Sequence, residues 1–273
     1  MLTNNRMFGE WTQRLEQLNK SYITANPFEH VVIPNFFSEN TANQIYNQFP
    51  DPDDTWFKYD NPFEGKYIFN TFKPDDPMKR VIDSMYTPEF LGYMSTLSGI
   101  EKLESDPHLN AGGLHAYSRN GMSGVHLDYT IHPITGKERR LSIMVYMSKN
   151  WDNTWGGNLK MWDENLENSV TMDHSLWNTA LVFKTNGPTY HGFPEPIKCP
   201  EGVYRKVIGI YYVSEPTAES LARPRKNAHY FAEPGKPVHE KMQKLLDIRR
   251  SRRLTPDDLA IWPTWRSDCG RDD

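Results

Sequence analysis

Between Gly113 and Ser214 the sequence breaks into many short strand-like runs, and this pattern limits the fold more than any other feature. The runs read LHAYS, GVHLDYT, RRLSIMVYMS, NLKMWD, TALVFKT, PTYHGF and YRKVIGIYYVS. Turn-forming residues separate them, among them Gly156-Gly157 and Asn186-Gly187-Pro188. Many short strands at close spacing are typical of a sandwich or a barrel. We therefore expect a mainly β protein with flanking helices, in a single domain.

In residues 1–112, before this β core, the sequence predicts helices and one long surface segment. A short strand and a helix are expected from His30 to Pro50, with Ser38 as the helix N-cap. Residues 50–76 are rich in Asp, Pro and aromatic side chains, which predicts a long surface segment with some strand content, of the kind that often forms the rim or lid of a site. Residues 78–100 carry apolar side chains at helical spacing.

The region after the β core, residues 215–273, predicts a helical extension, with Thr255-Pro256-Asp257-Asp258 at a helix start. Arg249 to Arg253 are expected at a solvated helix end, with an acidic or phosphorylated partner as the alternative. Lys226 and its neighbouring arginines are expected either on the surface or over the mouth of the barrel. His132 is expected on a surface loop.

Composition excludes several classes of function. The net charge of −4 over 273 residues shows no basic excess, so nucleic-acid binding is not expected. Two cysteines, Cys199 and Cys269, make neither a disulfide framework nor a cysteine metal site. The N-terminal residues lack an apolar signal segment and no run of 18 apolar residues occurs, so we expect a cytoplasmic chain without a membrane span. The oligomeric state is left open.

The stretch SGVHLDYT places a histidine and an aspartate two residues apart in a strand context. Residues i and i+2 of a strand point to the same face, so His126 and Asp128 are two metal ligands or a hydrogen-bonded pair. Non-haem iron oxygenases use two histidines and one carboxylate on one face of the metal. His191, in TYHGFPEP, would supply the third ligand from a later strand.

Arg205 begins an apolar strand and shares one face of it with Gly209 and Tyr211. An arginine followed by a small residue leaves room for a ligand carboxylate, and arginine binds carboxylates bidentately, as a dicarboxylate cosubstrate requires. In RRLSIMVYMS, Met144 and Tyr146 lie on the face expected to line a cavity. The Tyr146 hydroxyl can therefore join Arg205 on the same carboxylate.

The order of these motifs resembles the 2-oxoglutarate- and Fe(II)-dependent dioxygenases, and more narrowly their prolyl 4-hydroxylase-like branch. VYMSKNWDNTWGGNLKMWD is similar to that branch's Tyr-Leu-Asn-Lys-x-Trp followed by Gly-Gly and a strand. HAYSRNGMSGVHLD is similar to its Tyr, Gly-rich turn and His-x-Asp. The resemblance covers roughly residues 30–214 and implies a double-stranded β-helix, or jelly roll, over residues 113–214.

The resemblance also implies roles for these residues. His126, Asp128 and His191 would bind Fe(II), while Arg205 and Tyr146 would hold the far carboxylate of 2-oxoglutarate. Tyr117 matches a tyrosine that lines the same pocket. The implied reaction uses O2 to hydroxylate an unactivated C–H bond and releases succinate and CO2, with ascorbate as a candidate reductant. The sequence departs from the oxygen-sensing prolyl hydroxylases in the longer interval before Arg205, which makes Lys206 a competitor, although alternation points Lys206 the other way.

The substrate is less constrained than the reaction. The resemblance favours a prolyl residue in a protein or peptide, followed by a small molecule or a saccharide intermediate. His115, Met144, Tyr211 and Arg223 are the candidate substrate-binding residues. Two other classes stay open: a His/Asp/His zinc or cupin-type metalloenzyme, and a β-helix binding module without turnover.

Overall fold

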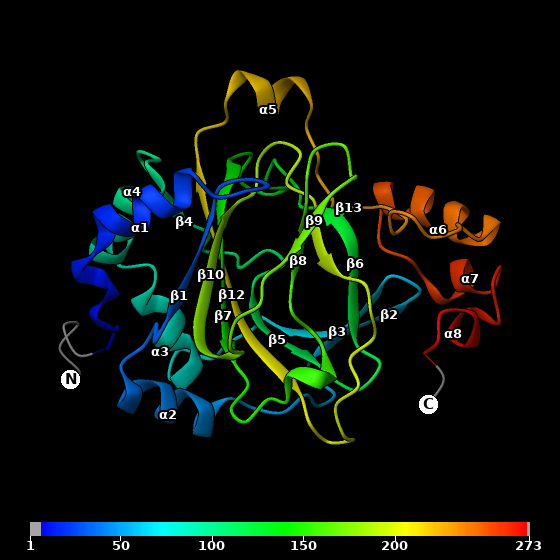
Figure 1. Ribbon diagram of the computed structural model, residues 1–273, viewed down its shortest axis with the longest axis horizontal. Coiled ribbons are helices and arrows are strands. Elements are labelled where there is room, and N and C mark those ends of the chain that lie inside the picture. The colour runs from blue at the N-terminus through cyan, green and yellow to red at the C-terminus, as the bar shows by residue number, and fades with distance from the viewer. Residues whose placement is uncertain (1–6, 272–273) are drawn as a thin grey trace.

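The computed structural model describes residues 7–271, in which thirteen strands join in one curled antiparallel sheet between two groups of helices (Figure 1). The order along the sheet is β1-β10-β7-β12-β5-β3-β6-β11-β8-β9, and β4, β2 and β13 pair with β12, β3 and β6. The strands are β1 (His30–Pro34), β2 (Phe57–Asn61), β3 (Glu64–Phe69), β4 (Glu104–Ser105), β5 (Gly113–Tyr117), β6 (Met122–Leu127), β7 (Glu138–Met147), β8 (Lys160–Trp162), β9 (Ser169–Thr171), β10 (Trp177–Lys184), β11 (His191–Phe193), β12 (Arg205–Ser214) and β13 (His229–Tyr230). The predicted mainly β fold with flanking helices is confirmed.

The N-terminal helices pack on one side of the sheet (Figure 1). They are η2 (Glu10–Gln13), α1 (Leu15–Ile23), α2 (Glu39–Gln48), α3 (Pro77–Ser84) and α4 (Pro88–Ser98). Ser38 caps α2 as expected, because its side chain accepts a hydrogen bond from the Thr41 amide. The larger apolar core lies beneath these helices and takes in one face of β7, Leu141, Ile143, Val145 and Met147. The opposite face of β7 therefore turns toward the interior of the curled sheet.

Residues 50–76 contain the expected strands, but part of this segment lies deeper than the predicted surface position. β2 and β3 form a hairpin, and β3 lies inside the sheet between β5 and β6. Phe63 and Glu64 are buried there. The many Asp and Pro residues favour a surface position, and pairing of β3 with two neighbouring strands overrides that local composition. Part of the predicted surface segment is thus a wall of the barrel.

The C-terminal extension contains four helices, α5 (Ala218–Ala222), α6 (Glu240–Ser251), α7 (Pro256–Leu259) and α8 (Trp265–Asp268). Helices α6, α7 and α8 lie on the other side of the sheet, and α5 lies at the top of the view, beyond the ends of the strands (Figure 1). α7 starts where predicted, with a capping box between Thr255 and Asp258. Strand β13 was not predicted, and it pairs Tyr230 with His126 of β6. None of the helices in residues 7–271 has the length and apolar composition needed to cross a bilayer.

Two predictions of surface position are wrong. Arg249 is only 6% exposed and donates to Glu64 Oε2 at 2.9 Å, because the last turn of α6 packs against β3. His132 is 1% exposed, and its Nε2 lies 3.2 Å from Asp106 Oδ1. Its Nδ1 accepts hydrogen bonds from two backbone amides of the following turn. A loop that folds back on the sheet buried this histidine, which no local pattern indicated.

The Arg249–Glu64 pair is the buried link between the C-terminal extension and the sheet. Burial alone would raise the pKa of Glu64, but the Arg249 charge and hydrogen bonds from Arg249 and Tyr230 lower that pKa to about 2. The carboxylate is thus ionised, and its stabilisation is present above about pH 4.5 and lost as the pH falls toward 2.

We predict that Arg249→Met lowers the free energy of unfolding by about 3–5 kcal/mol, because it removes the hydrogen-bonded cation from the buried Glu64 and leaves only Lys66, at 3.7 Å. The double variant Glu64→Gln/Arg249→Met should recover much of that loss, since no charge then stays buried. Urea denaturation at pH 7 measures both, with Arg250→Met, an exposed neighbour, as the control. A single variant as stable as the parent protein would show that the pair does not hold the extension in place.

Candidate metal centre

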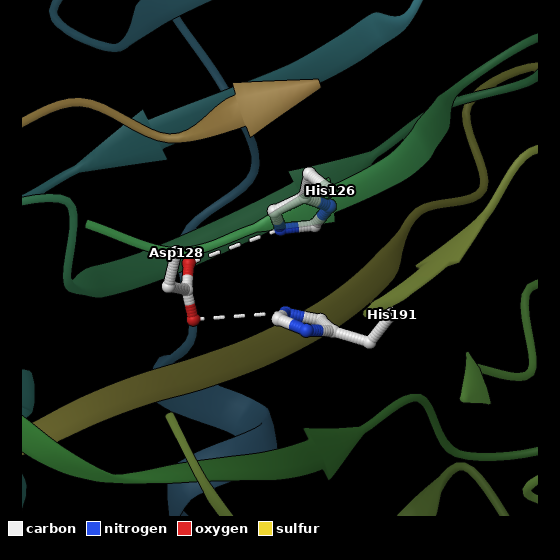
Figure 2. Close-up of side chains that lie close together, drawn as sticks. All are labelled: His126, Asp128 and His191. Atoms are coloured by element: carbon white, nitrogen blue, oxygen red, sulfur yellow. Dashed lines mark ion pairs between the residues drawn. The ribbon is translucent and has the colours of Figure 1, made fainter. Parts of the chain in front are cut away.

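His126, Asp128 and His191 converge on one point inside the curled sheet (Figure 2). His126 lies in β6, Asp128 follows the end of that strand, and His191 begins β11, directly opposite His126 in the antiparallel pairing. One ligand atom from each side chain lies within 4.8 Å of the other two. The Nε2 atoms of His126 and His191 lie 3.8 and 3.6 Å from the two oxygens of Asp128. This is the spacing of three ligands around one cation.

The backbone orients both imidazole rings. Nδ1 of His126 lies 2.9 Å from the Gly124 carbonyl, and Nδ1 of His191 lies 2.8 Å from the Thr189 carbonyl. A proton on each Nδ1 donates to that carbonyl, so the Nε2 lone pair of each ring points at the shared centre. Burial lowers the pKa of His126 to about 3 and lowers that of His191, so both rings are neutral, the form that binds metals.

Asp128 is held by Arg139, a residue that the sequence analysis did not single out. The Arg139 guanidinium donates to Asp128 Oδ2 at 2.7 Å and to Ser142, and it stacks on the Tyr211 ring. Burial alone would raise the pKa of Asp128, but the Arg139 charge is the main cause that lowers it to about 2. Strict alternation places Arg139 on the face of Leu141, away from the site. A register shift between β7 and β12 at this point reverses its face.

Arg205 forms a second centre beside the three ligands. It is fully buried at the start of β12, and its guanidinium carbon lies 5.0, 4.9 and 4.5 Å from the ring centroids of Tyr117, Tyr146 and Phe193. Among residues 7–271, its three side-chain nitrogens have no hydrogen-bond partner, and neither has the Tyr146 hydroxyl. A buried, unpaired charge is costly, so this arrangement fits an anion that the polypeptide does not itself supply.

The surroundings of Arg205 explain two sequence features. A Cβ at Gly157 would lie 2.9 Å from Arg205 Cδ, so the second glycine of Gly156-Gly157 leaves space for the arginine. Lys206 points the other way, with its Nζ near the Phe49 carbonyl and 2.7 Å from Asp51. Arg205 therefore faces the interior and Lys206 faces away from it, as strand alternation predicts.

A cavity of about 170 Å³ opens onto the three ligands and includes most of the other predicted residues. His115, Tyr117, Met144 and Tyr211 line it. His115 Nε2 lies 3.2 Å from the Ala111 carbonyl, and its Nδ1 is buried with no partner among the described residues. Arg223 does not line the cavity and is exposed at the end of α5.

The C-terminal extension adds to this cavity residues that were not among the predicted site residues, although an acidic or phosphorylated partner was the alternative for Arg249 to Arg253. Tyr230 of β13 stacks on His126 with ring centroids 4.9 Å apart, and its hydroxyl donates to Glu64. Arg249 and Arg253 also line the cavity. Their approach depends on pairing between β13 and β6, which are about a hundred residues apart in the chain, so no local signal could have identified them.

The comparisons with known proteins agree with this site. Residues 112–213 match the family model described as the 2OG-Fe(II) oxygenase superfamily. No curated protein matches the chain. The expected resemblance is therefore confirmed over residues 112–213, which make up fewer than half of the chain. The matched family uses Fe(II) and 2-oxoglutarate with O2.

Solved structures share the fold at low sequence identity. A prolyl hydroxylase from Trichoplax adhaerens, in complex with a hypoxia inducible factor peptide, has a TM-score of 0.52 and 16% identity over 77% of this chain and 95% of its own. A prolyl-4-hydroxylase from Pseudomonas putida has a TM-score of 0.50 and 14% identity over 74% of this chain and 99% of its own. An oxidoreductase of the 2OG-Fe(II) oxygenase family from Burkholderia pseudomallei has a TM-score of 0.50 and 9% identity over 73% and 89%. The predicted jelly roll is thus confirmed.

We predict that Mn(II) binds one site per chain and that Asp128→Ala nearly abolishes this binding. Arg139→Met should weaken it by roughly 10–100-fold, the usual cost of removing a side chain that orients a ligand. Isothermal titration with Mn(II) measures the affinities, and thermal melting confirms that each variant is folded. Arg140→Met is the matched control, because Arg140 donates to Ser214 and not to Asp128. Unchanged affinity in Asp128→Ala would place the metal elsewhere.

Proposed function

We propose that this chain is an Fe(II)- and 2-oxoglutarate-dependent hydroxylase in which His126, Asp128 and His191 bind the metal and Arg205 binds the cosubstrate. The observation that carries the proposal is the buried guanidinium of Arg205, whose nitrogens have no partner among the described residues. A zinc hydrolase or a cupin-type isomerase has no use for this group. A dicarboxylate that reaches from the metal to Arg205 accounts for both centres together.

In this proposal each residue of the site has a distinct role. Arg205 and the hydroxyl of Tyr146 bind the far carboxylate, with Tyr117 on the wall beside them. The aromatic rings around Arg205 exclude water and so strengthen that ion pair. Arg139 keeps Asp128 ionised and fixes the direction of its oxygens. The bound Fe(II) and 2-oxoglutarate supply O2 activation, so that a substrate C–H becomes C–OH while 2-oxoglutarate becomes succinate and CO2, with ascorbate as the proposed reductant.

For the substrate, we propose a prolyl residue in a peptide or protein, with a small molecule or saccharide as the second choice. The support is the fold shared with two prolyl hydroxylases, one of them bound to a peptide. The small cavity over the metal ligands accepts a single side chain or a compact molecule rather than a folded segment. His115, Met144 and Tyr211 are the proposed substrate contacts, and Arg223 is left out because it is exposed elsewhere.

The first test is anaerobic and needs no substrate. Apoprotein mixed with Fe(II) and 2-oxoglutarate should develop a visible metal-to-ligand charge-transfer band. Arg205→Ala should raise the 2-oxoglutarate concentration needed for half of the band by roughly 30-fold or more, since it removes one partner of a buried charge pair. Lys206→Ala is the matched control, because its side chain points away from the site.

Three outcomes separate the candidate functions. A band weakened in Arg205→Ala and unchanged in Lys206→Ala supports the proposal. Metal binding without a charge-transfer band would favour a zinc or cupin-type metalloenzyme instead. A normal band with no succinate released aerobically, for any tested peptide or small molecule, would favour a binding module without turnover.

We further predict that Gly157→Ala weakens 2-oxoglutarate binding while leaving Mn(II) affinity unchanged. The added methyl group would lie 2.9 Å from Arg205 Cδ and displace the guanidinium. Gly156→Ala is the matched control, because Gly156 also has a positive φ but has open space around its missing side chain. Equal losses in both variants, measured by titration of the charge-transfer band, would trace the effect to backbone strain rather than to Arg205.

A further inference from the structure

The cavity over the metal ligands has an excess of positive charge that the proposed reaction does not use. The lysine and arginine side chains that line it are Lys66, Arg139, Lys226, Arg249 and Arg253. The two carboxylates of the lining are already paired, Asp128 with Arg139 at 2.7 Å and Glu64 with Arg249 at 2.9 Å. The whole chain has a net charge of −4, so this excess is local.

Three cations therefore face the cavity without a full counter-ion. Lys66 lies 3.7 Å from Glu64, a carboxylate that it shares with Arg249. Lys226 and Arg253 have no carboxylate partner among residues 7–271 and are exposed at the cavity wall. Arg253 packs on the rings of Phe57 and Tyr59, and these contacts leave its charge without a counter-ion.

The three cations come from two parts of the chain, and two of them, Lys66 and Arg253, lie against one ring. Lys66 of β3 lies 5.1 Å from the centroid of the Tyr59 ring, and the Arg253 guanidinium carbon lies 5.3 Å from the same centroid. Lys226 lines the same cavity from the segment before β13. The side chain of Lys66 is only 13% exposed, so its charge acts in a partly dry environment.

Binding of metal and cosubstrate does not neutralise this group. The two negative charges of 2-oxoglutarate are matched by Arg205 and the metal, and Asp128 is matched by Arg139 and the metal. Lys66, Lys226 and Arg253 therefore stay in excess in the loaded site. Like charges lining one cavity attract an oppositely charged ligand and guide its approach.

We propose that the substrate carries an anionic group, a carboxylate or a phosphate, which Lys66, Lys226 and Arg253 bind at the mouth of the cavity while the reacting C–H bond lies over the metal. This inference rests on the proposed function and narrows its substrate class. The anionic group can belong to an acidic side chain next to the hydroxylated residue of a peptide, or to a small free acid. Both present the same chemistry to the three cations.

The test uses the full chain loaded with Mn(II) and saturating 2-oxoglutarate, so that Arg205 is already occupied and no turnover occurs. The probes are a fluorescein-labelled hexa-aspartate peptide and a hexa-lysine peptide, followed by fluorescence anisotropy at low salt. The parent protein should bind the aspartate peptide and not the lysine peptide. The double variant Lys226→Glu/Arg253→Glu should bind the aspartate peptide about tenfold more weakly or worse.

A matched control separates the cavity from overall charge. Lys198→Glu/Lys244→Glu changes the net charge by the same amount at two exposed positions that do not line the cavity, and it should bind the aspartate peptide as the parent does. Equal binding of the two peptides by the parent protein would overturn the proposal. So would a preference for aspartate that survives the cavity variant, or one that the control variant loses as well.

Two further arms complete the experiment. Unlabelled tricarballylate that displaces the peptide at low concentration would identify small acids as the source of the anionic group, whereas peptide binding that resists it would identify acidic peptides. The 2-oxoglutarate charge-transfer titration, run on the same variants with Fe(II), should be unchanged. If the parent protein shows no band at all, it is the proposed function that fails, and this outcome is distinguishable from loss of peptide binding alone.

Discussion

The antiparallel pairing of β6 with β11 is the constraint on which the rest of the site depends. It places His191 directly opposite His126, so two ligands about 65 residues apart in the chain share one face of the sheet. The strands approach closely at Gly192, where a Cβ would lie 2.5 Å from the Gly124 carbonyl. The same carbonyl accepts the Nδ1 proton of His126. The Gly124 carbonyl thus lies at the close approach of the two strands and also orients the His126 ring.

The barrel contains two buried ion pairs and one buried arginine without a counter-ion among the described residues. Arg139 neutralises Asp128, and Arg249 neutralises Glu64 on the neighbouring wall. Arg205 alone has no such partner among the described residues. Since a buried charge without a counter-ion destabilises a fold, the free protein carries a cost at Arg205 that a bound dicarboxylate would remove.

The C-terminal extension is part of the site rather than an appendage. Through β13 it stacks Tyr230 on His126, and through α6 it contributes Arg249 and Arg253 to the cavity wall. An enzyme that keeps a common core can change its substrate by changing the segment that closes the barrel mouth. In this chain that segment brings positive charge, and so the substrate class proposed above depends on residues outside the part matched by the family model.

The sequence by itself determined the β core and the three residues of the candidate metal site, His126, Asp128 and His191. Strand alternation predicts a shared face for His126 and Asp128, and short-range periodicity predicts most helices, because both are properties of neighbouring residues. Only the tertiary structure decided that residues 57–69 enter the sheet, that a register shift turns Arg139 inward, and that Arg249 is buried. Each of these depends on pairing or packing between segments far apart in the chain. A pattern of neighbouring residues does not predict the free energy of such long-range contacts.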